Sequence, residues 1–146
     1  MEVTINVNGK DTKITLTPDQ VGQVKKATTN YTDITSVEKA FEFEGINYNE
    51  WCNRYKDLPT DVRAYMKLCI IVKAINGGIV MDYKNTREYK YYPWFNAVGS
   101  GAGFSYYVYY YGNSGSAVGS RLCFIDSERA TFAGKQFIEI YNEYIN

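Results

Sequence analysis

A tyrosine-rich stretch over residues 87–124 alternates β-prone runs with segments rich in glycine and serine. The runs are REYKYYPWF, GFSYYVYYY and SRLCF, and the segments between them are NAVGSGA and GNSGSAVG. Aromatic and β-branched residues favour strands, and Gly/Ser clusters between such runs favour turns. The spacing therefore predicts a three-stranded antiparallel meander. The glycines of GSGAGF do not form a phosphate-binding loop, because no Lys-Ser/Thr pair and no helix follow them.

The N-terminal part predicts a β-hairpin followed by a helix. Apolar and polar residues alternate over residues 3–7, Asn8-Gly9 supplies a tight turn, and the alternation then resumes. The sequence TPDQ at residues 17–20 places a capping threonine before a proline and ends in the glutamine of a capping box. A helix should run from Pro18 to about Ala27. The polar residues 28–36 predict a linker.

The chain after the linker predicts helices that enclose the meander. Ser36 caps one helix, which stops at Gly45, and a short helix begins at Asn47 or Asn49. A longer amphipathic helix opens at Pro59-Thr60. Its predicted apolar stripe is Val62, Tyr65, Met66, Cys69, Val72 and Ile75. Asp126 caps a single C-terminal helix.

These elements predict an α+β protein. It has an N-terminal β-hairpin and helix (residues 1–30) and a main α+β domain (residues 36–146), the latter made of central helices, the meander and the C-terminal helix. We expect the core to form where the long and C-terminal helices meet one face of the meander. Its expected members are Val62, Met66, Cys69, Val72, Phe137, Ile140 and Tyr141.

Charge and composition narrow the function classes. Sixteen basic and sixteen acidic residues cancel, so we expect no binding to long duplex nucleic acid or to a membrane. The chain has no histidine, which removes the usual general base at neutral pH and most zinc chemistry. We predict a non-enzymatic protein with no metal and no cofactor.

Three cysteines and the N-terminal sequence predict the compartment. Cys52, Cys69 and Cys123 are odd in number and widely spaced, which favours free thiols in a reducing environment. The first ten residues carry charges and no long apolar core, and no run of about 18 apolar residues exists to span a bilayer. We therefore expect a cytoplasmic location.

The tyrosine-rich stretch is the candidate binding site. Strand alternation predicts two ring-bearing faces, one with Tyr106, Val108 and Tyr110 and the other with Tyr107, Tyr109 and Tyr111. The basic residues between Tyr83 and Phe124 are Lys84, Arg87, Lys90 and Arg121, and Glu88 is the one acid, so the segment carries 4 − 1 = +3. Rings interleaved with positive charge suit a small anionic, nucleotide-like ligand.

The candidate ligand-binding residues are Lys90, Trp94, Phe104, Ser105, Tyr107, Tyr109, Ser120 and Arg121. Two plainer interpretations stay open. The tyrosines are also typical of a hydrated β-face, and Arg121 is equally suited to a structural ion pair with Glu128 or Asp126.

Several motifs together resemble a protein family. They are YYPWF (91–95), GFS (103–105), GSRLCF (119–124) and AGKQF (133–137) with Ile140-Tyr141. The combination resembles a family of small proteins encoded by phages and prophages of gut Bacteroidales, over about residues 41 to 145. Where that family usually has a second tryptophan and an aspartate after the long helix, this chain has GIVMDYKN.

The resemblance implies a phage protein in the host cytoplasm or, alternatively, in the virion. The first expectation is an accessory protein that sequesters a nucleotide-type ligand and counteracts host defence signalling. The alternative is a virion or assembly protein whose tyrosine-rich sheet is a subunit interface. In both cases we expect a homo-oligomer, because so many rings exceed what a short chain hides.

Overall fold

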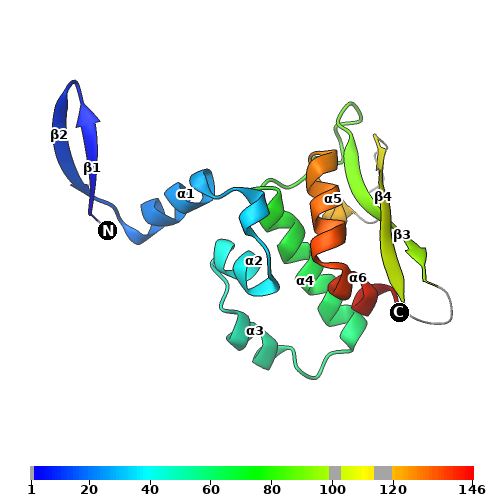
Figure 1. The fold of residues 1–146 in the computed structure, drawn as a ribbon. Helices are drawn as coiled ribbons and strands as arrows, with labels where there is room; N and C mark the ends of the chain where they lie inside the picture. The colour runs from blue at the N-terminus through cyan, green and yellow to red at the C-terminus, as the bar shows by residue number, and fades with distance from the viewer. Residues whose placement is uncertain (1, 99–102, 114–119) are drawn as a thin grey trace.

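The computed structural model describes residues 2–98, 103–113 and 120–146. It has a mixed α+β architecture in which a layer of helices packs on one face of a small antiparallel sheet, and a separate hairpin stands at the N-terminus (Figure 1). Most of the two predicted Gly/Ser-rich turns, at residues 99–102 and 114–119, lie outside the described residues.

The N-terminal arm, residues 2–28, consists of β1 (Glu2–Val7), β2 (Lys10–Thr15) and α1 (Pro18–Thr28). The predicted capping box is confirmed: the Thr17 side chain accepts from the Gln20 amide, and the Gln20 side chain accepts from the Thr17 amide. No residue of β1, β2 or α1 is buried. Figure 1 shows the hairpin projecting away from the rest of the molecule, so the arm adds nothing to the core.

The middle of the chain forms α2 (Val37–Phe43), α3 (Tyr48–Arg54) and α4 (Thr60–Ile75). Ser36 and Asn47 cap α2 and α3 through their side chains, as predicted. A short 3-10 turn, η1 (Tyr31–Asp33), occupies part of the predicted linker. Its neighbour Ile34 is buried, so the linker already contributes to the core.

The buried face of α4 differs from the predicted stripe. Val62 is 39% exposed, and Met66 and Cys69 are half-buried. The residues that α4 buries are Ala64, Leu68, Ile71, Val72, Ala74 and Ile75. The helix carries two overlapping apolar stripes, and its contacts with α2, α5 and α6 select the one through Leu68 and Ile71.

The sheet has two strands, β3 (Lys90–Ala97) and β4 (Phe104–Gly112), and the predicted third strand is wrong. Residues of SRLCF instead form a 3-10 turn, η3 (Ser120–Leu122), followed by an isolated bridge between Phe124 and Tyr91. The 3-10 turn ends at Leu122 and Asp126 already caps the next helix, which leaves too few residues for a strand. Buried Asn76 holds this short segment from the side away from β3, because its side chain donates to the Cys123 carbonyl and accepts from the Ile125 amide. Those two backbone groups are tied to the end of α4 rather than to a strand.

The predicted C-terminal helix is divided into α5 (Ser127–Gln136) and α6 (Ile138–Ile145), with a break at Phe137. Asp126 caps α5 by accepting from the Arg129 amide at 2.8 Å, as predicted. Phe137 and Tyr141 are both buried in the core cluster that includes Leu68, and half-buried Ile140 packs against it, so this part of the predicted core is confirmed.

Candidate interaction surface

A β-bulge determines which tyrosines face outward. Trp94 pairs with Val108 but Phe95 pairs with Tyr106, which leaves Tyr107 as an extra residue in β4. A bulge interrupts the regular alternation of side chains. The predicted face that joined Tyr106 to Val108 and Tyr110 is therefore wrong, because Tyr106 lies on the opposite side of the sheet from them.

The inner face of the sheet packs on α5. A methyl group added to Gly134 would lie 2.5 Å from the Tyr106 ring and 2.7 Å from Pro93, so helix and sheet are in close contact there. The Tyr106 hydroxyl donates to Thr131 at 3.1 Å. Tyr109 also lies on this side, packed against the core cluster. Tyr109 thus has a structural role within the described part of the chain.

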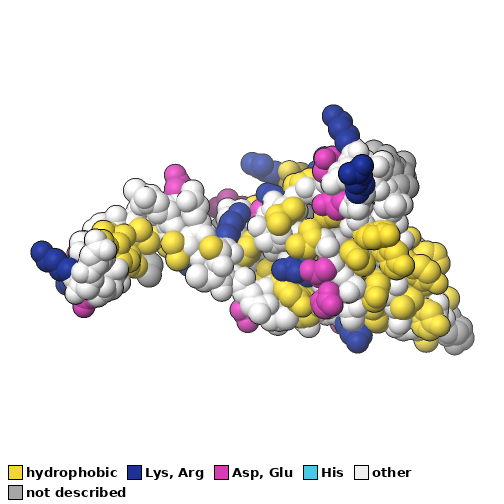
Figure 2. Space-filling model, turned by 90° about the horizontal axis from the view of Figure 1, so that it is seen from above, with side chains coloured by type: hydrophobic (Ala, Val, Ile, Leu, Met, Phe, Trp, Pro, Cys, Tyr) yellow, Lys and Arg dark blue, Asp and Glu magenta, His cyan; other side chains and the backbone are white. Residues whose placement is uncertain are grey.

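The outer face presents three rings to solvent, and we call Trp94, Tyr107 and Tyr110 the outer aromatic face. They are 49%, 63% and 49% exposed. Trp94 and Tyr110 touch edge to face, with ring centroids 5.2 Å apart. Figure 2 shows hydrophobic side chains gathered over the β3–β4 end of the molecule. The sequence from Tyr91 to Ser120 contains no charged residue, so this face is aromatic and uncharged.

Lys90 is a structural cation. Its side chain is nearly buried, with the residue 3% exposed, and its ammonium donates to the carbonyls of Asn85 and Glu88 at 2.6 and 2.9 Å. The Glu88 carboxylate lies 3.3 Å away, and the Tyr83 ring lies 5.5 Å below the ammonium. These contacts brace the loop before β3, so the Lys90 charge is already neutralised there.

Arg121 lies on η3 beside α4, on the helical side of the molecule. Its side chain is exposed, and within the described part of the chain no ion pair to it is found. Asp126, one of its predicted partners, pairs with Arg129 instead. Arg121 and Lys73 line a cavity of about 80 Å³, well below the roughly 300 Å³ of small-molecule pockets.

The remaining candidates lie elsewhere. Phe104 is half-buried at the start of β4, where Asn142 of α6 binds both its amide and its carbonyl. Ser105 is exposed opposite Asn96. Ser120 begins η3. The structure therefore brings Trp94 and Tyr107 to one face, and it does not bring Lys90 or Arg121 to that face.

Each of the three cysteines lies beside a tyrosine that shares its environment. Burial raises the pKa of the Cys69 thiol, next to Tyr65, and likewise the pKa of the Cys123 thiol, next to Tyr83. Burial, with a hydrogen bond to Cys52, raises the pKa of Tyr48 to about 12. Among the described residues none of the three cysteines forms a disulfide, as predicted. The raised pKa values keep the Cys69 and Cys123 thiols protonated at neutral pH, which is unlike a catalytic thiolate.

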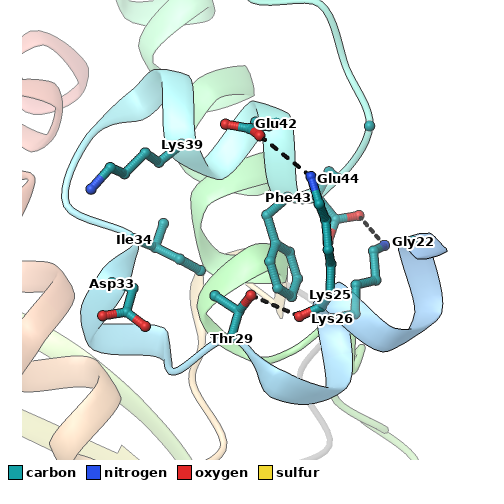
Figure 3. Close-up of a pocket in the computed structure, with 11 residues that line it drawn as sticks. Gly22, Lys25, Lys26, Thr29, Asp33, Ile34, Lys39, Glu42, Phe43 and Glu44 are labelled. Carbon is teal, nitrogen blue, oxygen red and sulfur yellow. Dashed lines mark hydrogen bonds and ion pairs between the residues drawn. The ribbon is translucent and has the colours of Figure 1, made fainter. Parts of the chain in front are cut away.

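Sequence reasoning missed a cleft between α1 and α2, with a volume of about 480 Å³ (Figure 3). Lys25 and Lys26 of α1 reach across it to Glu42 and Glu44, at 3.9 and 3.7 Å. The Lys26 ammonium also lies 5.4 Å from the centre of the Phe43 ring. The one sequence feature that could have indicated this cleft is Gly22, because a glycine inside a predicted helix often has a packing or functional reason.

Among the described residues, no cluster of three or more histidine, cysteine, aspartate or glutamate side chains is arranged to hold a metal ion. The same residues include no helix with the length and apolar character needed to cross a bilayer. Comparison of the chain with models of known families, with curated proteins and with solved structures finds no match in any of the three.

Proposed function

We propose that this chain is a non-catalytic assembly protein that uses the outer aromatic face to bind a second copy of itself. The observation that carries the proposal is the exposure of Trp94, Tyr107 and Tyr110 on a sheet face without charged residues. Protein interfaces are enriched in tyrosine and tryptophan and depleted of charge at their centres. The resemblance to phage proteins supports a role in a virion or its assembly.

A second copy is a suitable partner for two reasons. The chain has no net charge, and its outer aromatic face has none either, so two copies do not repel each other. Among the described strands β4 pairs only with β3, so its other edge carries backbone groups that can pair with a second copy. A symmetric contact through the outer aromatic face would cover the rings of both copies at once.

The test is the oligomeric state of wild type, Trp94→Ala, Tyr110→Ala and a matched control, Tyr144→Ala. Tyr144 is also an exposed aromatic residue, but it lies on α6. Light scattering after size exclusion, at micromolar concentration, should give a dimer for wild type and the control. Both face variants should give monomers with unchanged circular dichroism. A monomeric wild type, or face variants that still dimerise, would refute the proposal.

Capture of a small anionic, nucleotide-type ligand is a second candidate, and it is favoured by Arg121, which is exposed and has no ion-pair partner among the described residues. Such binding would sequester a signal of host defence. Because Arg121 and Trp94 lie on different sides of the sheet, Arg121→Ala should remove the thermal shift caused by mono-, di- and cyclic nucleotides. Trp94→Ala should leave it unchanged. A panel with no effect on wild type would eliminate this candidate.

A further inference from the structure

We infer that the cleft between α1 and α2 binds a small uncharged molecule that has an apolar body and a hydrogen-bond donor for Glu44. The cleft volume of about 480 Å³ lies within the range of roughly 300–1,000 Å³ that is usual for small-molecule sites. The inference is independent of the outer aromatic face, since the cleft is formed by α1, α2 and the turn between them.

Glu44 supplies the polar anchor. Its side chain is 2% exposed, and its Oε2 lies 2.6 Å from the Lys73 ammonium and 3.7 Å from that of Lys26. Its Oε1 is buried and has no hydrogen-bond partner among the described residues. Buried carboxylate oxygens almost always accept a hydrogen bond. This oxygen is closed to solvent in the present conformation, so a donor on a molecule in the cleft would complete its coordination once the carboxylate turns toward the cleft.

The charges around the cleft favour an uncharged occupant. Three lysines and three acids line it and cancel: Lys25, Lys26, Lys39, Asp33, Glu42 and Glu44. An ion bound among these groups would unbalance their charges and lose its own hydration, whereas a neutral molecule would do neither. Buried Ile34 and half-buried Phe43 provide the apolar surface between them (Figure 3).

Gly22 keeps the cleft open on the α1 side. It lies inside a helix, where glycine is unfavourable relative to alanine, and a Cβ at this position would meet nothing within 4 Å. A larger side chain at position 22 would therefore enter the cleft without a clash with the backbone. This provides a way to block the site and leave the helix intact.

The test uses three probes of similar size: p-cresol, toluene and 4-hydroxybenzoate. They carry, respectively, a neutral donor, no donor, and a donor with an added negative charge. NMR titration of the full chain should show p-cresol binding at least about tenfold more tightly than either of the others, as expected for one hydrogen bond to a charged group. The shifted amide signals should lie in α1 and α2.

Two variants test the location. Gly22→Leu should weaken p-cresol binding by at least about tenfold, because the new side chain fills the cleft. Gln23→Leu adds the same side chain at the next, exposed position of α1, outside the cleft, and should bind p-cresol like wild type. Three outcomes would overturn the inference. They are equal binding of p-cresol and toluene, equal binding of p-cresol by the two variants, and an ordered water at Glu44 with no binding of any probe.

Discussion

Gly134 shows how a single missing methyl group sets the distance between helix and sheet. It lies inside α5, where an added Cβ would approach Tyr106 and Pro93 to within 2.5 and 2.7 Å. Such distances are shorter than van der Waals contact, so a larger residue must push α5 away from the inner face. The Tyr106–Thr131 hydrogen bond and the packing of the core depend on that closeness.

Gly134→Ala should therefore destabilise the protein, by about 1–3 kcal/mol, through overpacking. Gly22→Ala is the matched control, because both glycines lie in helix interiors and only Gly22 has free space around it. The control should stabilise α1 by up to about 1 kcal/mol through helix propensity. The measurement is the free energy of unfolding from urea titration. Equal effects of the two substitutions would show that α5 does not touch the sheet as described.

At the scale of elements, the sequence correctly predicted the helix starts and the hairpin turn, because contacts between near neighbours in the chain determine both. Thr17, Ser36 and Asp126 marked helix starts, because a capping side chain acts on its own next turn. Asn8-Gly9 marked the hairpin turn, since both residues adopt positive φ values.

Features that depend on contacts between residues far apart in the chain could not be predicted from local sequence patterns. The third strand was wrong because residues 120–122 form a 3-10 turn, and Asn76, far along the chain, fixes the backbone on both sides of Phe124. The bulge at Tyr107 likewise depends on register with β3. For the candidate site, aromatic composition predicted exposed rings, but nothing in the local pattern marked Lys90 as buried.

The N-terminal arm provides a prediction at this scale. No residue of its strands or helix is buried, and its ion pairs to the body join exposed lysines to Glu42 and Glu44. The Lys25–Glu42 pair is exposed and contributes about 0–1 kcal/mol. Glu44 is buried, but without the arm it keeps its 2.6 Å ion pair to Lys73. A chain lacking residues 1–29 should keep its melting temperature to within about 4 °C, the shift caused by 1 kcal/mol at this size. Calorimetry on both chains checks this, and a much larger loss would mean that the arm belongs to the folding unit.

For the molecule as a whole, the raised pKa values predict sensitivity to alkali. Burial raises the pKa of the Cys69 and Cys123 thiols and of Tyr65, and it raises the pKa of Tyr48 to about 12. Each group is held neutral in the folded state and ionises more readily in the unfolded chain. Its contribution is therefore fully present below the unfolded pKa and lost as the pH rises toward the folded value.

The melting temperature should accordingly stay constant up to about pH 8.5, the pKa of the unfolded thiols, and should begin to fall above that pH. It should fall more steeply above about pH 10, where the tyrosines of the unfolded chain ionise. Differential scanning calorimetry between neutral and alkaline pH measures this. Cys69→Ser serves as the control, because it removes one of the thiols and should reduce the first part of the decline. A melting temperature that rises with pH above 9 would contradict the assignment.

The two tryptophans occupy opposite environments, and this makes the chain its own optical reporter. Trp51 is buried on α3 against the ring of Phe41, whereas Trp94 stands half-exposed on the outer aromatic face. Their fluorescence should therefore separate: acrylamide should quench Trp94 readily and Trp51 poorly. In a Trp51→Phe variant, a blue shift of the remaining emission with rising concentration would record burial of the outer aromatic face without any label. In a Trp94→Phe variant, the emission would report loss of the packing around α3.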